Sequence, residues 1–236
     1  MCTMKKLKLN YTDIFFDLDG TLWDFETNSL ETLNEIYENH QLQQAGIPDF
    51  EKFLKIYHVH NDRLWDLYRA GEVEKDALKI NRFVYTLNHF GIDNKMLADT
   101  IAFDYVSISP TKTHLFAHAH QTLNYLKFRY RLHIITNGFN EVQFVKLRKS
   151  GLSDYFTHVI TSELAGVSKP DSGIFNYALT LAGARAQNSL MIGDDLDIDI
   201  HGAASVGMDQ LYFSRAKLLT NNINRIQSLD ELQRLL

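Results

Sequence analysis

Two aspartates near the start of the chain have a spacing that could support chemistry. The run 14–22 reads Ile-Phe-Phe-Asp-Leu-Asp-Gly-Thr-Leu, which places Asp17 and Asp19 at alternate positions after an apolar segment. Residues two apart in a strand point to the same face, so the two carboxylates can converge on one spot. Like charges this close repel each other, and a hard divalent cation such as Mg2+ would relieve the repulsion. The alternative is a surface turn after a strand, where Asp and Gly are common.

Two further polar segments follow apolar runs later in the chain. Thr136-Asn137-Gly138 follows the run 132–135, and its hydroxyl and backbone N–H groups could hold phosphate oxygens. A turn followed by a helix cap would explain this segment equally well. Lys169 lies in Gly166-Val167-Ser168-Lys169-Pro170, where it could balance phosphate charge and position an attacking carboxylate. An ordinary exposed lysine is the alternative interpretation.

A dense acidic segment follows the apolar run 190–192. It reads Gly193-Asp194-Asp195-Leu196-Asp197-Ile198-Asp199, and four acids so close together suggest a metal site. The alternative is that Asp195 or Asp197 caps the next helix, which we expect of at least one of them. Together the four segments, each at the end of a predicted parallel strand, predict a phosphate and Mg2+ site assembled from four loops.

The elements that must position these residues alternate between strand and helix. Apolar runs predict strands at 11–18, 132–135, 158–160, 190–192 and 211–213. The spacing of apolar residues predicts helices at 115–128, 141–149, 174–182, 198–206 and 229–236. This alternation predicts an α/β fold, with a doubly wound parallel sheet and right-handed crossovers.

The stretch after the first strand has a purely helical pattern instead. It predicts an all-helical domain inserted at 24–108, and a core domain formed by 1–23 and 109–236. Thr27-Asn28-Ser29 offers cap chemistry for the first helix, and Asp49 can start the second. Aromatics of this region could stack on a nucleobase. We expect most of the following side chains to be core residues of a helical bundle instead: Trp23, Tyr57, His58, His60, Arg63, Trp65 and Tyr68.

Composition narrows the class of protein. The 236 residues carry a net charge of -5 with no basic stripe, which argues against a nucleic-acid-binding surface. Cys2 is the single cysteine, so no intrachain disulfide is possible. Segment 1–9 lacks the apolar region of a signal peptide, and no run reaches the length of a membrane span. We therefore expect a cytoplasmic protein, monomeric or homodimeric.

Three histidines offer a second metal alternative. His114 and His118 are four apart at the predicted helix 115–128, and His120 follows them. No glutamate stands between the first two in the register of a zinc protease. A solvated helix face is therefore the favoured interpretation.

With these motifs assembled, the sequence resembles the haloacid dehalogenase-like phosphohydrolase superfamily over nearly the whole chain. Asp17-Leu18-Asp19-Gly20-Thr21-Leu22 resembles its first motif, and Ile135-Thr136-Asn137-Gly138 resembles the second. Ser168-Lys169-Pro170 resembles the third, and Gly193-Asp194-Asp195 with Asp199 resembles the fourth. The resemblance implies a Rossmann-like core, and the helical insertion resembles a type C1 cap.

The resemblance also implies a mechanism, a phosphatase reaction through an aspartyl-phosphate. Asp17 would be the nucleophile, and Asp19 would be the general acid and base. Thr136 and the backbone of Asn137 would hold the phosphoryl oxygens, and Lys169 would neutralise charge. Dehalogenases of the superfamily lack an acid at the position of Asp19, so the sequence indicates phosphoryl transfer.

A Mg2+ ion is the cofactor that the resemblance implies. Its ligands would be Asp17, Asp194 and the backbone carbonyl of Asp19. Asp195 and Asp199 would support these ligands or bind the metal occasionally.

Longer segments are similar to the pyrimidine 5'-nucleotidases of this superfamily, namely 22–25, 134–139, 151–156 and 162–170. Several members of that subfamily carry an acid where this chain has Gly20, and Gly193-Asp194-Asp195 replaces their Gly-Asp-Ser or Gly-Asp-Thr. The similarity implies a small phosphorylated metabolite as substrate, a pyrimidine nucleoside 5'-monophosphate. A sugar-phosphate phosphatase, a phosphomutase and a non-catalytic binding protein on this fold are the alternatives.

Overall fold

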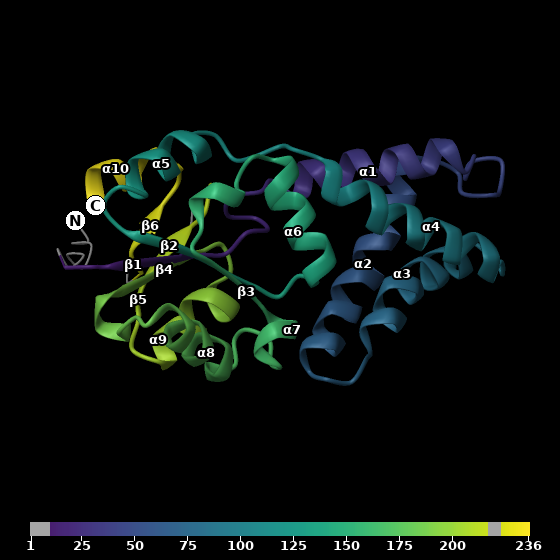
Figure 1. Cartoon of the computed structure of the whole chain (residues 1–236). Helices are drawn as coiled ribbons and strands as arrows, with labels where there is room; N and C mark the ends of the chain where they lie inside the picture. Colours follow the sequence, from purple (N-terminus) through teal and green to yellow (C-terminus); the bar gives the residue numbers. More distant parts are fainter. Residues whose placement is uncertain (1–9, 217–222) are drawn as a thin grey trace. The chain divides into compact units, whose positions relative to one another are not determined.

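A computed structural model describes residues 10–216 and 223–236 of the chain (Figure 1). The predictions for Cys2 and for segment 1–9 lie outside the described residues. The chain divides into two compact units, one formed by the chain up to Phe25 together with Thr113–Leu236, the other by Glu26–Lys112. The predicted insertion 24–108 begins and ends within a few residues of the second unit.

The first unit is built on a six-stranded sheet with the strand order β3-β2-β1-β4-β5-β6, in which every neighbouring pair is parallel. The strands are β1 Asp13–Phe16, β2 Arg131–Thr136, β3 His158–Thr161, β4 Ser189–Gly193, β5 Asp209–Phe213 and β6 Arg225–Ile226. The predicted α/β fold with a doubly wound parallel sheet is confirmed. Strand β6 was absent from the prediction because two residues are too few to show a periodic pattern.

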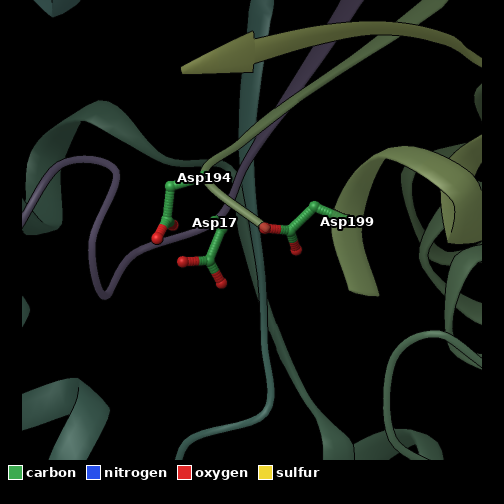
Figure 2. A group of neighbouring side chains, drawn as sticks. All are labelled: Asp17, Asp194 and Asp199. Atoms are coloured by element: carbon green, nitrogen blue, oxygen red, sulfur yellow. The ribbon is translucent and has the colours of Figure 1, made fainter. Parts of the chain in front are cut away.

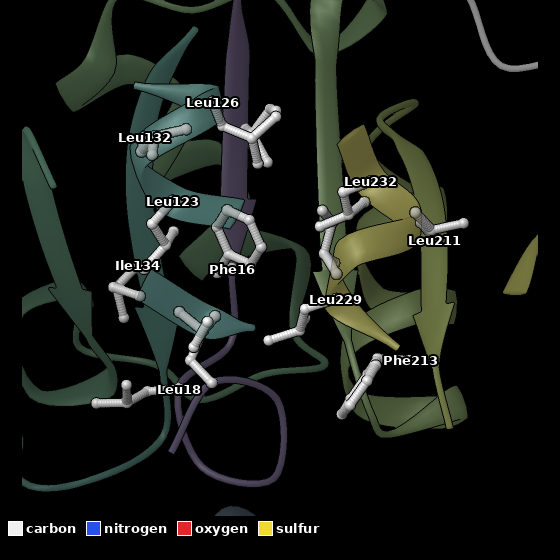
Figure 3. Close-up of a cluster of buried hydrophobic side chains, with 14 of the residues drawn as sticks. Phe16, Leu18, Leu123, Leu126, Leu132, Ile134, Leu211, Phe213, Leu229 and Leu232 are labelled. Carbon is white, nitrogen blue, oxygen red and sulfur yellow. The ribbon is translucent and has the colours of Figure 1, made fainter. Parts of the chain in front are cut away.

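Helices cover both faces of this sheet. They are α5 Ala119–Leu126, α6 Asn140–Lys149, α7 Ser162–Ala165, α8 Ser172–Ala182, α9 Gly202–Ser205 and α10 Leu232–Leu235. Successive side chains of a strand alternate between faces. Ile14 and Phe16 of β1 accordingly belong to one apolar cluster with leucines of α5, α6 and α10, whereas Phe15 packs with residues of α8 and α9. Figure 3 shows Phe16 in this cluster with Leu123 and Leu126 of α5 and Leu232 of α10. The buried run at the start of the chain is thus the central strand between two apolar layers.

The strand order places β1 between β2 and β4. The chain first adds β2 and β3 on one side of β1, and then crosses over to add β4, β5 and β6 on the other side. The carboxyl ends of β1 and β4 therefore flank the point where the order reverses, which is where open α/β sheets bind their ligands. Asp17 and Asp194 directly follow these two strands.

Three predicted helices differ in the structure. Segment 198–206 is a π-helical turn, Leu196–His201, followed by α9, and segment 229–236 is the 3-10 turn Leu229–Glu231 followed by α10. The predicted helix 115–128 begins only at Ala119. Leu115 pairs with Trp23 in an antiparallel bridge instead. Other 3-10 turns are Ser109–Thr111, Ser153–Tyr155 and Ala186–Asn188.

The later start of α5 removes the helical spacing on which the alternative metal site at His114 and His118 depended. His114 precedes α5, and His118 has a left-handed backbone at the start of that helix, so the two do not share a helical face. The ring of His118 contacts Gln121, and that of His120 contacts Tyr155, each at 3.2 Å.

The second unit consists of four helices, α1 Phe25–Asn39, α2 Phe50–Arg69, α3 Lys75–His89 and α4 Lys95–Ile108. Asp49 caps α2 as predicted, since its Oδ1 accepts from the Lys52 N–H at 2.8 Å. The predicted cap at 27–29 is wrong because α1 already begins at Phe25, and Asn28 and Ser29 are buried within it. None of the helices in the described part of the chain is both long and apolar enough to cross a membrane.

The aromatic side chains of this unit bear out the core interpretation in part. Tyr57 is fully buried among aromatic neighbours, while Trp65 and Tyr68 are half-buried and pack edge to face. Trp23 belongs to the core of the first unit, where it is fully buried. His58 and His60 are half-buried, and Arg63 is exposed.

Candidate active site

The buried ammonium group of Lys169 organises the polar residues at the carboxyl end of the sheet. Its Nζ donates to Asp17 Oδ1, to Asp199 Oδ1 at 2.6 Å and to the Ile135 carbonyl at 2.9 Å. These three acceptors use all three N–H groups of the lysine. Lys169 is only 2% exposed, so the interpretation as an ordinary surface lysine is wrong.

The charge of Lys169 is fixed by its neighbours. Burial by itself lowers the pKa of this ammonium, but the carboxylates of Asp17 and Asp199 outweigh burial and raise the pKa above its ordinary value. The side chain therefore stays cationic across the physiological pH range. A permanent positive charge at this position would lower the repulsion between the neighbouring carboxylates and an anionic ligand.

Three carboxylates gather beside this lysine. Asp17, Asp194 and Asp199 each offer one oxygen, and these oxygens all lie within 4.8 Å of one another (Figure 2). Burial and the neighbouring carboxylates raise the pKa of Asp17, opposed by Lys169. Burial, and then the charge of Asp199, raise the pKa of Asp194 to about 7. A set of crowded, oxygen-only donors whose charges oppose one another fits a hard cation such as Mg2+.

The side chain of Asn137 fixes the loop that carries Lys169. Its Nδ2 donates to the Lys169 carbonyl at 2.9 Å, and its Oδ1 accepts from the Lys169 N–H at 2.7 Å. Thr136 is buried, and its hydroxyl accepts from the Gly138 N–H at 3.1 Å. The loop after β2 is thereby tied both to itself and to the loop after α7.

Asp19 has hydrogen-bond partners of its own on α6. Its Oδ2 accepts from Gln143 Nε2 at 2.8 Å, and its Oδ1 accepts from Lys146 Nζ at 2.6 Å. The structure ends β1 at Phe16, so Asp17 and Asp19 belong to the loop that follows this strand. The two aspartates have different partners.

Asp195 acts as the predicted helix cap. Its Oδ1 accepts from the N–H groups of Asp197 and Ile198, both at 2.9 Å. The Asp195 N–H in turn donates to Asp199 Oδ2 at 3.2 Å, and Asp197 is exposed. Both oxygens of Asp199 are thus engaged, one by Lys169 and the other by this backbone N–H.

The sequence does not predict the roles of three contact residues, namely Thr21, Gln143 and Lys146. The Thr21 hydroxyl donates to Asp194 Oδ1 at 2.8 Å, which links the loop after β1 to the loop after β4. Gln143 and Lys146 stand three apart on α6, directly after the loop that follows β2. Such spacing places two side chains on one helix face, but it does not show which residue they contact.

Close approach explains two glycines of the motifs. A Cβ on Gly20 would lie 2.3 Å from Asp194 Oδ2, and Gly20 has a φ of +89°. A Cβ on Gly138 would lie 1.5 Å from Gln143 Nε2. In this backbone, a side chain at position 20 would therefore require the carboxylate of Asp194 to shift.

A comparison with protein families identifies the chain. A family model described as haloacid dehalogenase-like hydrolase matches residues 14–207. The chain belongs to this family. It is therefore a hydrolase, and the predicted resemblance is confirmed.

Curated relatives are consistent with this membership. The chain is 31% identical over 208 residues to the pyrimidine 5'-nucleotidase PynA of Streptococcus pneumoniae, which covers 86% of this chain and 84% of that protein. It is 30% identical over 200 residues to a glyceraldehyde 3-phosphate phosphatase of Methanothermobacter thermautotrophicus, covering 84% and 83%. Both relatives are named for small phosphomonoesters.

A solved structure supports the fold. The HAD-hydrolase YfnB from Bacillus subtilis, solved bound to magnesium, matches with a TM-score of 0.86 and 26% identity. The match covers 96% of this chain and 98% of that chain.

We predict that Gly20→Ala lowers phosphomonoester hydrolysis about 10- to 100-fold, because the new methyl group would displace Asp194 by an ångström or more. Gly91→Ala is the matched control: Gly91 has a φ of +76° and nothing within 4 Å of a built Cβ. It carries similar backbone strain without the clash, and should retain activity. Equal activity in the wild type and both variants, measured at saturating substrate, would contradict the close approach.

Proposed function

We propose that the chain is a Mg2+-dependent phosphatase that hydrolyses small phosphomonoesters through an aspartyl-phosphate on Asp17. The single observation that carries the proposal is the buried contact of Lys169 with Asp17, beside the carboxylate of Asp194. Lys169 engages Asp17 Oδ1 and leaves Oδ2, which receives no hydrogen bond from the described residues, to act as the nucleophile. Family membership as a hydrolase supports this role.

The donor set suits the metal that the family implies. Asp17, Asp194 and the backbone carbonyl of Asp19 would hold Mg2+, while Asp199 is engaged by Lys169 and by the Asp195 N–H. Bound there, the ion would screen the repulsion between the carboxylates and the incoming phosphate. We infer that Asp195 and Asp199 support the site, Asp195 by capping and Asp199 by holding Lys169.

The first half of the reaction would transfer the phosphoryl group to the enzyme. Asp17 Oδ2 attacks phosphorus, and the bond between phosphorus and the leaving oxygen breaks. The leaving oxygen takes the proton of Asp19 and departs as an alcohol. The Thr136 hydroxyl, the Asn137 backbone N–H and the charge of Lys169 would hold the phosphoryl oxygens during the transfer.

The second half would release phosphate. Asp19, now a carboxylate, takes a proton from a water molecule whose oxygen attacks phosphorus. The bond between phosphorus and Asp17 then breaks, and inorganic phosphate leaves. Asp17 is regenerated as a carboxylate and Asp19 as an acid, so both are ready for another turnover.

For the substrate we propose a pyrimidine nucleoside 5'-monophosphate, supported by the similarity to PynA. A sugar-phosphate phosphatase is the second candidate, because a glyceraldehyde 3-phosphate phosphatase matches at nearly the same identity. A cytoplasmic location and a monomeric or homodimeric state stay predictions from the sequence.

A substrate panel tests this assignment. We predict that thymidine and uridine 5'-monophosphate release inorganic phosphate in the presence of Mg2+ at a higher kcat/KM than adenosine 5'-monophosphate or glyceraldehyde 3-phosphate. The reason is the sequence similarity to a relative that is named a pyrimidine 5'-nucleotidase. Rapid hydrolysis of glyceraldehyde 3-phosphate, without hydrolysis of any nucleotide, would contradict the nucleotidase assignment and favour a sugar-phosphate phosphatase.

Asp17→Asn should abolish turnover, with a loss of about 1,000-fold or more, since an amide cannot form the acyl phosphate. Asp197→Asn is the matched control, because Asp197 is an exposed acid of the same acidic segment and should tolerate the change. Phosphate release measured for both variants decides the point. An Asp17→Asn variant with wild-type activity would refute the mechanism.

The pKa of Asp194 predicts a pH dependence of Mg2+ binding. Since this pKa is raised to about 7, a proton occupies Asp194 and competes with the metal at lower pH, and it leaves as the pH rises. Saturating Mg2+ should therefore raise the Tm more at about pH 8 than at about pH 5.5. An Asp194→Asn control should lose the pH dependence. An equal Tm shift of the wild type at both pH values would contradict the prediction.

A further inference from the structure

Two residues outside the four motifs hold the carboxylate of Asp19. Gln143 and Lys146 lie on one face of α6, and each donates a hydrogen bond to a different oxygen of Asp19, at 2.8 and 2.6 Å. Building on the proposed function, in which Asp19 moves the proton, we propose that Gln143 and Lys146 are positioning residues for this proton transfer.

The position of Lys146 is set by burial and by aromatic rings. The side chain is only 4% exposed, and its Nζ lies 4.2 Å from the centre of the Trp23 ring and 5.9 Å from that of Phe25. A cation between ring faces and a carboxylate has few other orientations available. Lys146 therefore holds Asp19 in one place, whereas an exposed lysine would leave it free to move.

The amide of Gln143 is oriented at a cost to stability. Its Nε2 donates to Asp19, and its Oε1 is left buried without a hydrogen-bond partner among the described residues. An unpaired buried oxygen lowers the stability of the fold, because it has lost its hydrogen bonds to water. Gly138 keeps the space around this amide open, since a side chain there would collide with Nε2. A contact kept at such a cost indicates a role in the reaction more than in the fold.

The two donors match the charge that develops during the reaction. As Asp19 gives its proton to the leaving oxygen, negative charge grows on its two carboxylate oxygens. Gln143 and Lys146 face those oxygens and stabilise this charge where it appears. In the second half of the reaction the same contacts keep the carboxylate aimed at the attacking water.

The dependence on the leaving group tests the proposal. p-Nitrophenolate leaves without a proton, whereas the 5'-alkoxide of thymidine 5'-monophosphate needs one. For the nucleotide, kcat/KM of Gln143→Leu and of Lys146→Met should fall about 10- to 100-fold, and the fall should appear in kcat. For p-nitrophenyl phosphate, kcat/KM of the same variants should fall less than about 3-fold. Lys146→Arg should restore part of the loss, because it keeps a cationic donor.

Lys149→Met is the matched control, because Lys149 is an exposed lysine of the same helix, and it should change neither rate. Gln143→Leu should also keep or raise the Tm, since it removes the unpaired oxygen.

If one of the two variants, Gln143→Leu or Lys146→Met, does not fold, the other variant is sufficient for the test. An equal fall for both substrates, or no fall for either, would overturn the positioning role. A wild-type enzyme that hydrolyses neither substrate with Mg2+ would refute the proposed function itself, and the positioning role with it.

Discussion

The site depends on one buried charge, the ammonium group of Lys169 held between Asp17 and Asp199. Burying a charge costs several kcal/mol, and the cost is offset only if partners of good geometry surround it. Here two carboxylates and the Ile135 carbonyl supply those partners. The arrangement orients Asp17, because one of its oxygens is bound by Lys169. It also keeps a cation in place before any substrate arrives, so little reorganisation is needed during the reaction.

The parallel sheet is what makes this contact possible. Asp17 and Asp194 directly follow the neighbouring strands β1 and β4, while Lys169 comes from the loop beyond β3. Hydrogen bonds then tie these loops together: the Asn137 side chain grips the backbone of Lys169, and the Thr21 hydroxyl reaches Asp194. The site is therefore a set of loops braced against each other at the end of a rigid sheet.

The sequence predicted the groups that parallel strands bring to one edge, because apolar runs that end in polar residues are visible without a structure. Asp17 and Asp194 fall into this class, whereas Lys169 lies in the loop after α7, the short helix that follows β3. Gln143 and Lys146 do not belong to this class, since on a helix they resemble any polar pair and only the fold brings Asp19 to them. The start of α5 was missed for a related reason. Periodic leucines and phenylalanines extend the helical pattern across residues 115–118, whereas the bridge from Leu115 to Trp23 is a long-range contact. Long-range pairing of this kind leaves no local signal.

The most direct measurement of the central claim, that Asp17 is the nucleophile held by Lys169, is a crystal structure of the chain with Mg2+ and beryllofluoride, a mimic of an aspartyl-phosphate. If Asp17 is this nucleophile, beryllium will be bonded to the Asp17 oxygen that Lys169 does not hold, with Lys169 still in contact with the other oxygen. The metal will then lie at Asp17 and Asp194. Beryllofluoride bound to a different residue, or Mg2+ bound away from Asp17 and Asp194, would contradict it.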